Sequence, residues 1–301
     1  MNPSIASLLV ILCGILRSTD LYFRNSMVKA LPVIVLISWE HMVNLALLLP
    51  LLFTKAKEFR KMCVKDLLLF TMVGCGASAM GILCFSEAFH YINPALAVLL
   101  QKLQPIITIL LGTILLKEKI TGRFFGWALL AIICSYFVSF GLTDPFTGEW
   151  KKIASGAAYA MLAAFFWGGG TIWGKMLLQK FDQSFVLAGR FLLGTVFTVS
   201  MAFIFKGGLH ADAIFSQKAP LYGSIFYMAV ISGILATSFF YAGLKWVKAS
   251  QASILELFFP VSSVVIMWLS FNRPITPIQI VAGTIMFFAV YKINQTTDKK
   301  V

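Results

Sequence analysis

The sequence predicts an all-α integral membrane protein in which ten transmembrane helices form two inverted five-helix repeats. Three observations support this prediction. Hydrophobic residues make up 59% of the 301 residues. Charged residues make up only 12%, about half the charged fraction of soluble domains. The apolar residues gather into ten long runs, and the second half of the chain repeats the pattern of the first.

Each apolar run is close to the length of about 20 residues that a helix needs to cross a bilayer. The first run has no basic residue before it and no A-x-A-like site after it, so we expect a retained span rather than a signal peptide. The runs are continuously apolar, unlike the alternating strands of a β-barrel. We expect spans at residues 4–23, 31–53, 67–89, 93–116, 122–141, 153–173, 184–205, 220–244, 249–271 and 275–291.

An internal repeat relates the two halves of the chain. Pairs at an offset of 155 residues include Phe85 and Phe240, Ala97 and Ala252, Gln101 and Glu256, and Pro105 and Pro260. An earlier stretch repeats at an offset of 150, which sets Arg17 against Trp167 and Glu40 against Arg190. We expect a first repeat over residues 1–145, a second over 150–295 and a cytoplasmic tail at 296–301. Such duplication is typical of transporters, whose substrate site lies between the halves.

The distribution of basic residues predicts the orientation of the chain in the plasma (inner) membrane. With the N-terminus in the cytoplasm, fifteen loop Lys and Arg residues lie inside, and seven lie outside: Arg24, Lys29, Lys151, Lys152, Lys206, Lys218 and Arg273. This bias favours cytoplasmic termini. It also accounts for the net charge of +13, so we expect no nucleic-acid partner. Because each repeat has an odd number of spans, the second enters the membrane inverted.

Residue patterns for a cofactor, a metal site or an enzyme are missing from the sequence. The five cysteines show no C-x-x-C spacing, and there is no Walker A, G-x-S-x-G or H-E-x-x-H pattern. A membrane enzyme acting on lipid head groups would cluster His, Asp or Cys at one interface, whereas His41, His90 and His210 are scattered. We therefore expect no cofactor, and the expected partners are membrane lipid and a small-molecule substrate.

Several motifs resemble one known family. The stretch from Phe166 to Lys175, FWGGGTIWGK, followed by Arg190, is similar to the opening of an EamA repeat in the drug/metabolite transporter superfamily. The first half supplies the other end of the repeat, with YINPA at 91–95 and LLKEKIT at 115–121. The resemblance covers nearly the whole chain and implies a secondary carrier or facilitator of small metabolites. The two halves differ in charge at some equivalent positions, such as Glu118, which aligns with Arg273 in the second copy.

Charged side chains within the predicted spans are the first candidates for the substrate site. A charge at the bilayer centre costs about 2.5 to 3.5 kcal/mol, so it should be paired, hydrated or functional. The candidates are three basic and three acidic residues: Arg17, Lys102, Arg190, Glu40, Glu87 and Glu256. A structural role is open for each. Arg17 and Glu87 lie near span ends, and Glu40 could neutralise a basic neighbour.

The fourth and ninth spans carry the sharpest pattern. Gln101 and Glu256 each stand four residues before a proline, whose missing N–H frees a carbonyl one turn earlier. A polar side chain beside a freed carbonyl could bind an ammonium or hydroxyl group, although a kink that only shapes packing would look the same. We expect Glu256 to be deeply placed, and Glu256→Gln to stop transport without unfolding the protein.

Aromatic residues beside polar or flexible positions extend the candidate site. Trp167 precedes a triple glycine, Trp39 precedes Glu40, and Tyr241 lies in the repeat that carries Glu256. Glycines let helices approach closely or bend, and both readings stay open.

We expect alternating access of a small polar or zwitterionic, amino-acid-like metabolite, because the charges in the spans balance. The alternative is a multidrug or lipophilic-cation exporter. A proton is one candidate coupling ion, and the oligomeric state is not determined by the sequence.

Overall fold

The computed structural model describes residues 1–146, 149–211, 220–271 and 275–298, and every regular element in these ranges is helical. The first repeat contains α1 (Pro3–Ser18), α2 (Asp20–Ala30), α3 (Val33–Thr54), η1 (Ala56–Lys61), α4 (Val64–Thr71), η2 (Met72–Met80), α5 (Gly81–Ala88), α6 (Pro94–Gln101), α7 (Gln104–Leu115) and α8 (Gly122–Phe140). The second contains α9 (Trp150–Leu178), α10 (Gln183–Lys206), α12 (Pro220–Tyr227), η3 (Met228–Leu235), α13 (Ala236–Leu244), α14 (Ala249–Leu255), α15 (Phe258–Phe271) and α16 (Pro277–Asp298).

Ten helical segments within these ranges are long and apolar enough to cross a membrane, which confirms the predicted number of spans. The first one extends well beyond its predicted end. It runs over Pro3–Ala30, with a break at Thr19 between α1 and α2, instead of ending at residue 23. The assignment of Arg24 to an outer loop was therefore wrong. Arg24 is 1% exposed, and the neighbouring Asp20 and Glu40 carboxylates neutralise its charge inside the bundle.

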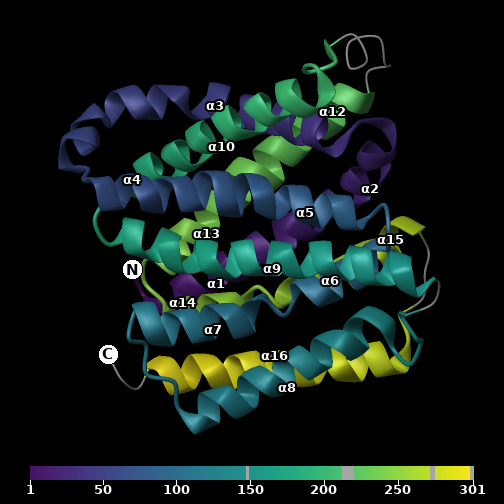
Figure 1. Ribbon diagram of the computed structural model, residues 1–301. Coiled ribbons are helices and arrows are strands. Elements are labelled where there is room, and N and C mark those ends of the chain that lie inside the picture. The colour runs from purple at the N-terminus through teal and green to yellow at the C-terminus, as the bar shows by residue number, and fades with distance from the viewer. Residues whose placement is uncertain (147–148, 212–219, 272–274, 299–301) are drawn as a thin grey trace.

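The packing of the helices follows a two-fold pattern between the repeats. The second span of each repeat packs against the other as α3 and α10, and the fifth spans pair as α8 and α16. These pairs lie at opposite faces of the bundle (Figure 1). Between these pairs, the first span of each repeat packs against the third span of the other: α1 packs on α13, and α9 packs on α5. Two five-span units packed in this way form the inverted-repeat architecture.

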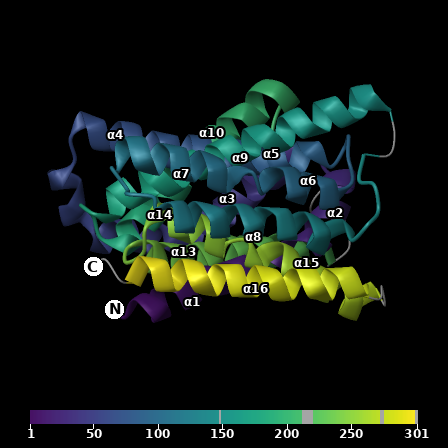
Figure 2. The ribbon, with the colours of Figure 1, turned by 90° about the horizontal axis from the view of Figure 1, so that it is seen from below.

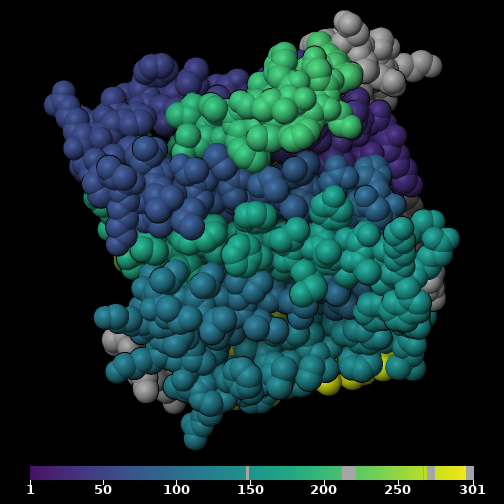
Figure 3. Space-filling view, in the orientation of Figure 1, coloured from purple at the N-terminus to yellow at the C-terminus, as the bar shows by residue number. Residues whose placement is uncertain are grey.

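The start of α1 and the end of α16 lie at the same end of the bundle, as an even number of spans requires (Figures 1 and 2). On the surface, the green end of α10 lies against the blue and purple segments of the first repeat (Figure 3). Side chains of the two repeats therefore form one continuous outer surface.

The spans nearest the centre are interrupted helices. The fourth breaks at Lys102 and Leu103 between α6 and α7, and the ninth breaks at Glu256 and Leu257 between α14 and α15. Pro105 and Pro260 follow these breaks and lack the N–H that would continue each helix. The third and eighth spans contain the π-helical segments η2 and η3 at equivalent places. Both repeats thus depart from regular α-helix at matching positions.

The triple glycine in α9 serves close packing rather than bending. The helix is continuous from Trp150 to Leu178. A Cβ added at Gly168 would lie 3.0 Å from the side chain of Ile107, and one at Gly170 would overlap Ala77. The glycines let α9 approach α7 and η2.

Two charged side chains hold the connection between α13 and α14. Glu118 accepts hydrogen bonds from the backbone N–H groups of Ala249 (2.7 Å) and Ser250 (3.1 Å), and so caps the start of α14. Lys175 donates to the carbonyls of Leu244 (2.7 Å) and Val247 (2.8 Å) at the end of α13. The counterpart of Glu118 in the repeat, Arg273, lies outside the described residues.

We expect Glu118→Gln to lower folded yield while leaving substrate affinity within about twofold. The variant keeps the size of the side chain but replaces charge-assisted hydrogen bonds, each worth about 1.5 to 3 kcal/mol, with weaker ones. Yield and thermal unfolding in detergent would be compared with ligand binding. Lys119→Gln, which changes an exposed neighbour, is the matched control. A selective loss of affinity at normal yield would contradict a structural role for Glu118.

Candidate functional site

A cavity between the two repeats is the candidate substrate site. It encloses about 850 Å³ of space free of atoms, including the part open to solvent. Seven of the ten residues proposed from the sequence line it: Arg17, Glu40, Gln101, Lys102, Trp167, Arg190 and Glu256. Residues from α1, α2, α3, α5, α9, α10 and the two interrupted spans meet here, and both repeats therefore contribute to its wall.

Glu256 lies at the centre of a polar cluster at the break of the ninth span. Its Oε1 is 2.8 Å from Nη1 of Arg17, and its Oε2 accepts a hydrogen bond from Gln104 at 3.0 Å. Gln101 donates in turn to Gln104 at 2.5 Å. The Glu256 carboxylate is thus paired rather than isolated. The backbone carbonyl of Glu256, one turn before Pro260, lies 3.5 Å from Nζ of Lys102.

Lys102 and Arg190 line the cavity, and neither has a carboxylate partner among the described residues. Besides the Glu256 carbonyl, the Lys102 ammonium lies 4.4 Å from the centre of the Phe259 ring. Arg190 donates from Nη1 to the Tyr241 hydroxyl at 3.2 Å, and its buried Nε has no hydrogen-bond partner in the described structure. Buried charges are normally paired. The charges of these two side chains therefore have no counter-ion among the described residues.

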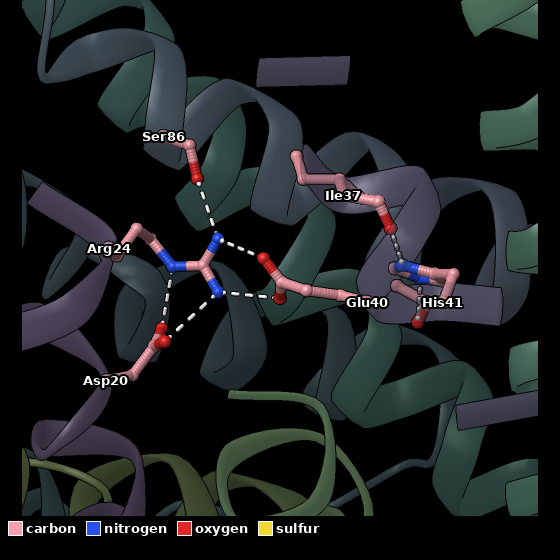
Figure 4. Close-up of polar contacts among 7 residues, drawn as sticks. Asp20, Arg24, Ile37, Glu40, His41 and Ser86 are labelled. Carbon is pink, nitrogen blue, oxygen red and sulfur yellow. Dashed lines mark hydrogen bonds and ion pairs between the residues drawn. The ribbon is translucent and has the colours of Figure 1, made fainter. Parts of the chain in front are cut away.

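A second ionic cluster, formed by Asp20, Arg24 and Glu40, lines another part of the cavity (Figure 4). Arg24 donates to both carboxylates, and its Nη1 also donates to Ser86 at 3.2 Å. Sequence reasoning missed Asp20 and Arg24. The signal that could have found them is their spacing of four residues, which places the two side chains on one helical face.

Aromatic side chains complete the wall of the cavity. Trp167, Phe85, Phe191 and Phe259 all line it, and Trp167 contacts Phe85 with ring centres 5.3 Å apart. Seven charged residues also line it. Counting Arg17, Arg24, Lys102 and Arg190 against Asp20, Glu40 and Glu256 gives 4 − 3, a net charge of +1. The cavity therefore combines flat apolar faces with an excess of hydrogen-bond donors.

Three of the proposed residues lie off the cavity wall. Successive residues on a helix point about 100° apart, so Trp39 points away from the cavity while its neighbour Glu40 faces it. The Trp39 indole donates instead to the carbonyl of Leu209 at 3.0 Å. Glu87 is likewise next to the inward-facing Ser86, and it lies 3.9 Å from Nε2 of the half-exposed His90. Tyr241 is fully buried and reaches the site only through its contact with Arg190.

Comparison with known families gives the same division of the chain. A model described as the EamA-like transporter family matches residues 4–140 and again residues 154–295. The chain belongs to the EamA-like transporter family. It is therefore a multi-pass membrane transporter, not an enzyme.

Curated members of the family are similar over most of their length. The riboflavin transporter ImpX of Fusobacterium nucleatum subsp. nucleatum is 30% identical over 254 residues, covering 83% of this chain and 84% of that protein. The uncharacterized transporter YoaV of Bacillus subtilis is 24% identical over 257 residues, covering 82% of each. A crystal structure with 15% sequence identity overlays on 98% of both chains with a TM-score of 0.78, which supports the fold alone.

Proposed function

We propose that this EamA-like transporter carries a flavin such as riboflavin by alternating access of its two inverted repeats around the central cavity. The observation that carries the proposal is the combination of aromatic walls with two cations that have no carboxylate partner among the described residues. Trp167 and Phe259 offer faces for a flat ring system, and Lys102 and Arg190 offer N–H groups to ring oxygens. The resemblance to a riboflavin transporter at 30% identity favours the same substrate class.

The chemistry of riboflavin suits this cavity. Its ring system is flat and apolar on both faces, with carbonyl oxygens along one edge that accept hydrogen bonds from cations. Its ribityl chain carries hydroxyl groups, which amide side chains such as Gln101 and Gln104 can bind. The cavity thus offers aromatic faces for the ring system and polar side chains for its carbonyl edge and ribityl chain.

A small zwitterion, such as an amino acid, is the second candidate. Its support is the separation of charge within the cavity, since the Asp20 and Glu40 cluster is acidic, whereas Lys102 and Arg190 have no carboxylate partner among the described residues. A lipophilic cation has less support, because the lining has a net charge of +1.

The test is transport by the purified protein in proteoliposomes. We expect saturable movement of riboflavin, followed by its fluorescence, with no competition from a panel of zwitterionic amino acids or from a lipophilic cation. Empty liposomes are the control for leakage. Movement of an amino acid without movement of riboflavin would replace the flavin proposal with the zwitterion one.

We further propose that the protein lies in the plasma membrane with both termini in the cytoplasm, and that its repeats span residues 1–145 and 150–295. The chain offers a native reporter for this orientation, because Cys63 is exposed in the turn after the second span. Its counterpart is Glu149, which is exposed before α9 at the other end of the bundle.

In whole cells, we expect a membrane-impermeant thiol reagent to label Cys63→Ser/Glu149→Cys but not the wild-type protein at Cys63. Permeabilised cells should label both. Cys63→Ser alone reports any background from the remaining cysteines. Labelling of both sites from the same side would contradict the proposed orientation of the repeats.

A further inference from the structure

Two buried carboxylates share one guanidinium at the Asp20–Arg24–Glu40 cluster. Arg24 lies 2.7 Å from Asp20 through Nε and 2.8 Å from Glu40 through Nη2, with further bonds of 3.2 and 3.1 Å to the second oxygens. The three side chains are only 9%, 2% and 8% exposed for Asp20, Arg24 and Glu40. With both carboxylates ionised, the charge of the cluster is 1 − 2, or −1.

An excess negative charge is costly at such a site. One buried cation can offset one carboxylate, whereas a second carboxylate close to the first is disfavoured both by burial and by the like charge. Two carboxylates that share one cation leave one negative charge in excess, and a single bound proton cancels it. The arrangement therefore favours a cluster in which Asp20 and Glu40 together hold a single proton.

The side chains around the cluster leave this excess charge without a dedicated partner. Arg17 is paired with Glu256. His41 lies 3.0 Å from the carbonyl of Ile37 through Nδ1 and 3.1 Å from the Ser78 hydroxyl through Nε2, contacts that suit a neutral ring (Figure 4). Other ionisable side chains on neighbouring elements include Glu87 on α5, which lies 3.9 Å from His90, and Tyr227 on α12, which donates to Thr19.

Lys102 and Arg190 line the same cavity and favour the ionised cluster while water fills the space between. Asn44, one turn after Glu40 on α3, is 2% exposed and also lines the cavity, and its Oδ1 has no hydrogen-bond donor in the described structure.

We propose that the Asp20–Arg24–Glu40 cluster is a proton-binding site that couples transport to the movement of one proton. The proton comes from water and returns to it, and no covalent bond forms. The cluster joins α2 to α3 and, through Ser86, to α5. Protonation removes the negative charge from one of the two carboxylates, so Arg24 holds that side chain less strongly and the three helices are held together less firmly.

The direction of coupling follows from the cavity and rests on the proposed function. A flat ring system that displaces water from the cavity lowers the local dielectric around the cluster, and burial disfavours the charged form of a carboxylate. Substrate binding therefore promotes protonation. The proton and the substrate are therefore bound to the same conformations of the protein and move together, as in a symporter.

Infrared spectroscopy of the purified, substrate-free protein tests the proton site directly. Between mildly acidic and alkaline buffer, both above the range near about pH 4 where exposed carboxylates titrate, we expect the wild-type protein to lose one protonated-carboxyl C=O band. Asp20→Asn and Glu40→Gln should each lack the band, because either change leaves one carboxylate paired with one cation. Glu256→Gln and Glu87→Gln should keep it.

Absence of the band from the wild-type protein overturns the proposal, whether or not the variants fold. Persistence in either Asp20→Asn or Glu40→Gln also overturns it, because a shared proton requires both carboxylates. Disappearance in Glu256→Gln would move the proton to the other cluster.

A pH indicator in weakly buffered solution tests the coupling. Addition of riboflavin should cause uptake of one proton per protein in the wild type and none in Asp20→Asn. Riboflavin binding without proton uptake by the wild type overturns the coupling and leaves the flavin proposal standing. Absence of riboflavin binding overturns the flavin proposal, while the infrared result still decides the proton site.

Discussion

Glu256→Gln is expected to abolish transport and to destabilise the protein by about 2 kcal/mol, because it leaves the Arg17 guanidinium at the cavity without its carboxylate. Breaking a fully buried pair costs about 3 to 5 kcal/mol, and the lower figure here allows for Arg17 being 28% exposed. Thermal unfolding in detergent and transport in proteoliposomes are the two measurements.

The double variant Arg17→Gln/Glu256→Gln separates pairing from function. Its two neutral side chains leave no unpaired charge, so we expect it to recover most of the lost stability while transport stays absent. Glu87→Gln, which removes a carboxylate off the cavity wall, is the control and should transport normally. Wild-type transport by Glu256→Gln would show that the cluster around this residue is structural.

Lys102→Met is expected to raise the substrate Kd at least tenfold, or about 1.4 kcal/mol, and to leave thermal stability unchanged or raised by about 1 kcal/mol. Replacing a buried cation that has no carboxylate partner removes a desolvation cost rather than an ion pair. Arg190→Met should act in the same direction, since its Nε has no hydrogen-bond partner among the described residues. Binding followed by quenching of riboflavin fluorescence, together with unfolding temperature, measures both effects.

A substrate-binding role for Lys102 predicts that Lys102→Met weakens substrate binding without lowering thermal stability. Arg17→Met is the matched comparison, because it removes a cation that is paired with Glu256 and should therefore destabilise the protein. Loss of stability with unchanged affinity in Lys102→Met would show that the lysine holds the two interrupted spans together and does not bind substrate.

The fold could be predicted from the sequence because the features that define it are local in the chain or repeat at a fixed spacing. Length and hydropathy define each span, and the offset of 155 residues relates the repeats before any contact is known. The first span was the main exception. Its extension to Ala30 depends on neutralisation of Arg24 by Glu40, a contact between two different spans.

The pairing of charges in the site could not be predicted in the same way. Arg17 and Glu256 are 239 residues apart and meet only because α1 packs against the ninth span. From the sequence, Glu256 was expected near Lys102, Arg190 and Gln101, and its replacement by glutamine was expected to leave folding intact. The ion pair revises that expectation. The rotation of each helix about its axis could not be predicted from the sequence either. Trp39 was therefore proposed for the cavity wall, which its neighbour Glu40 lines and Trp39 does not.

The matching π-helical segments show where each span can lose a residue. A π segment corresponds to one residue inserted into an α-helix, and its wider turn absorbs that residue without turning the helix that follows. Removing one residue from η2 would therefore restore a regular α-helix and leave Ile82 and Phe85 of α5 at the cavity. A deletion in η3 would likewise leave Thr237 of α13 in place. A deletion within a regular α-helical turn instead rotates the rest of the span by about 100°, so length changes among members that keep this site should fall in η2, in η3 or in the turns.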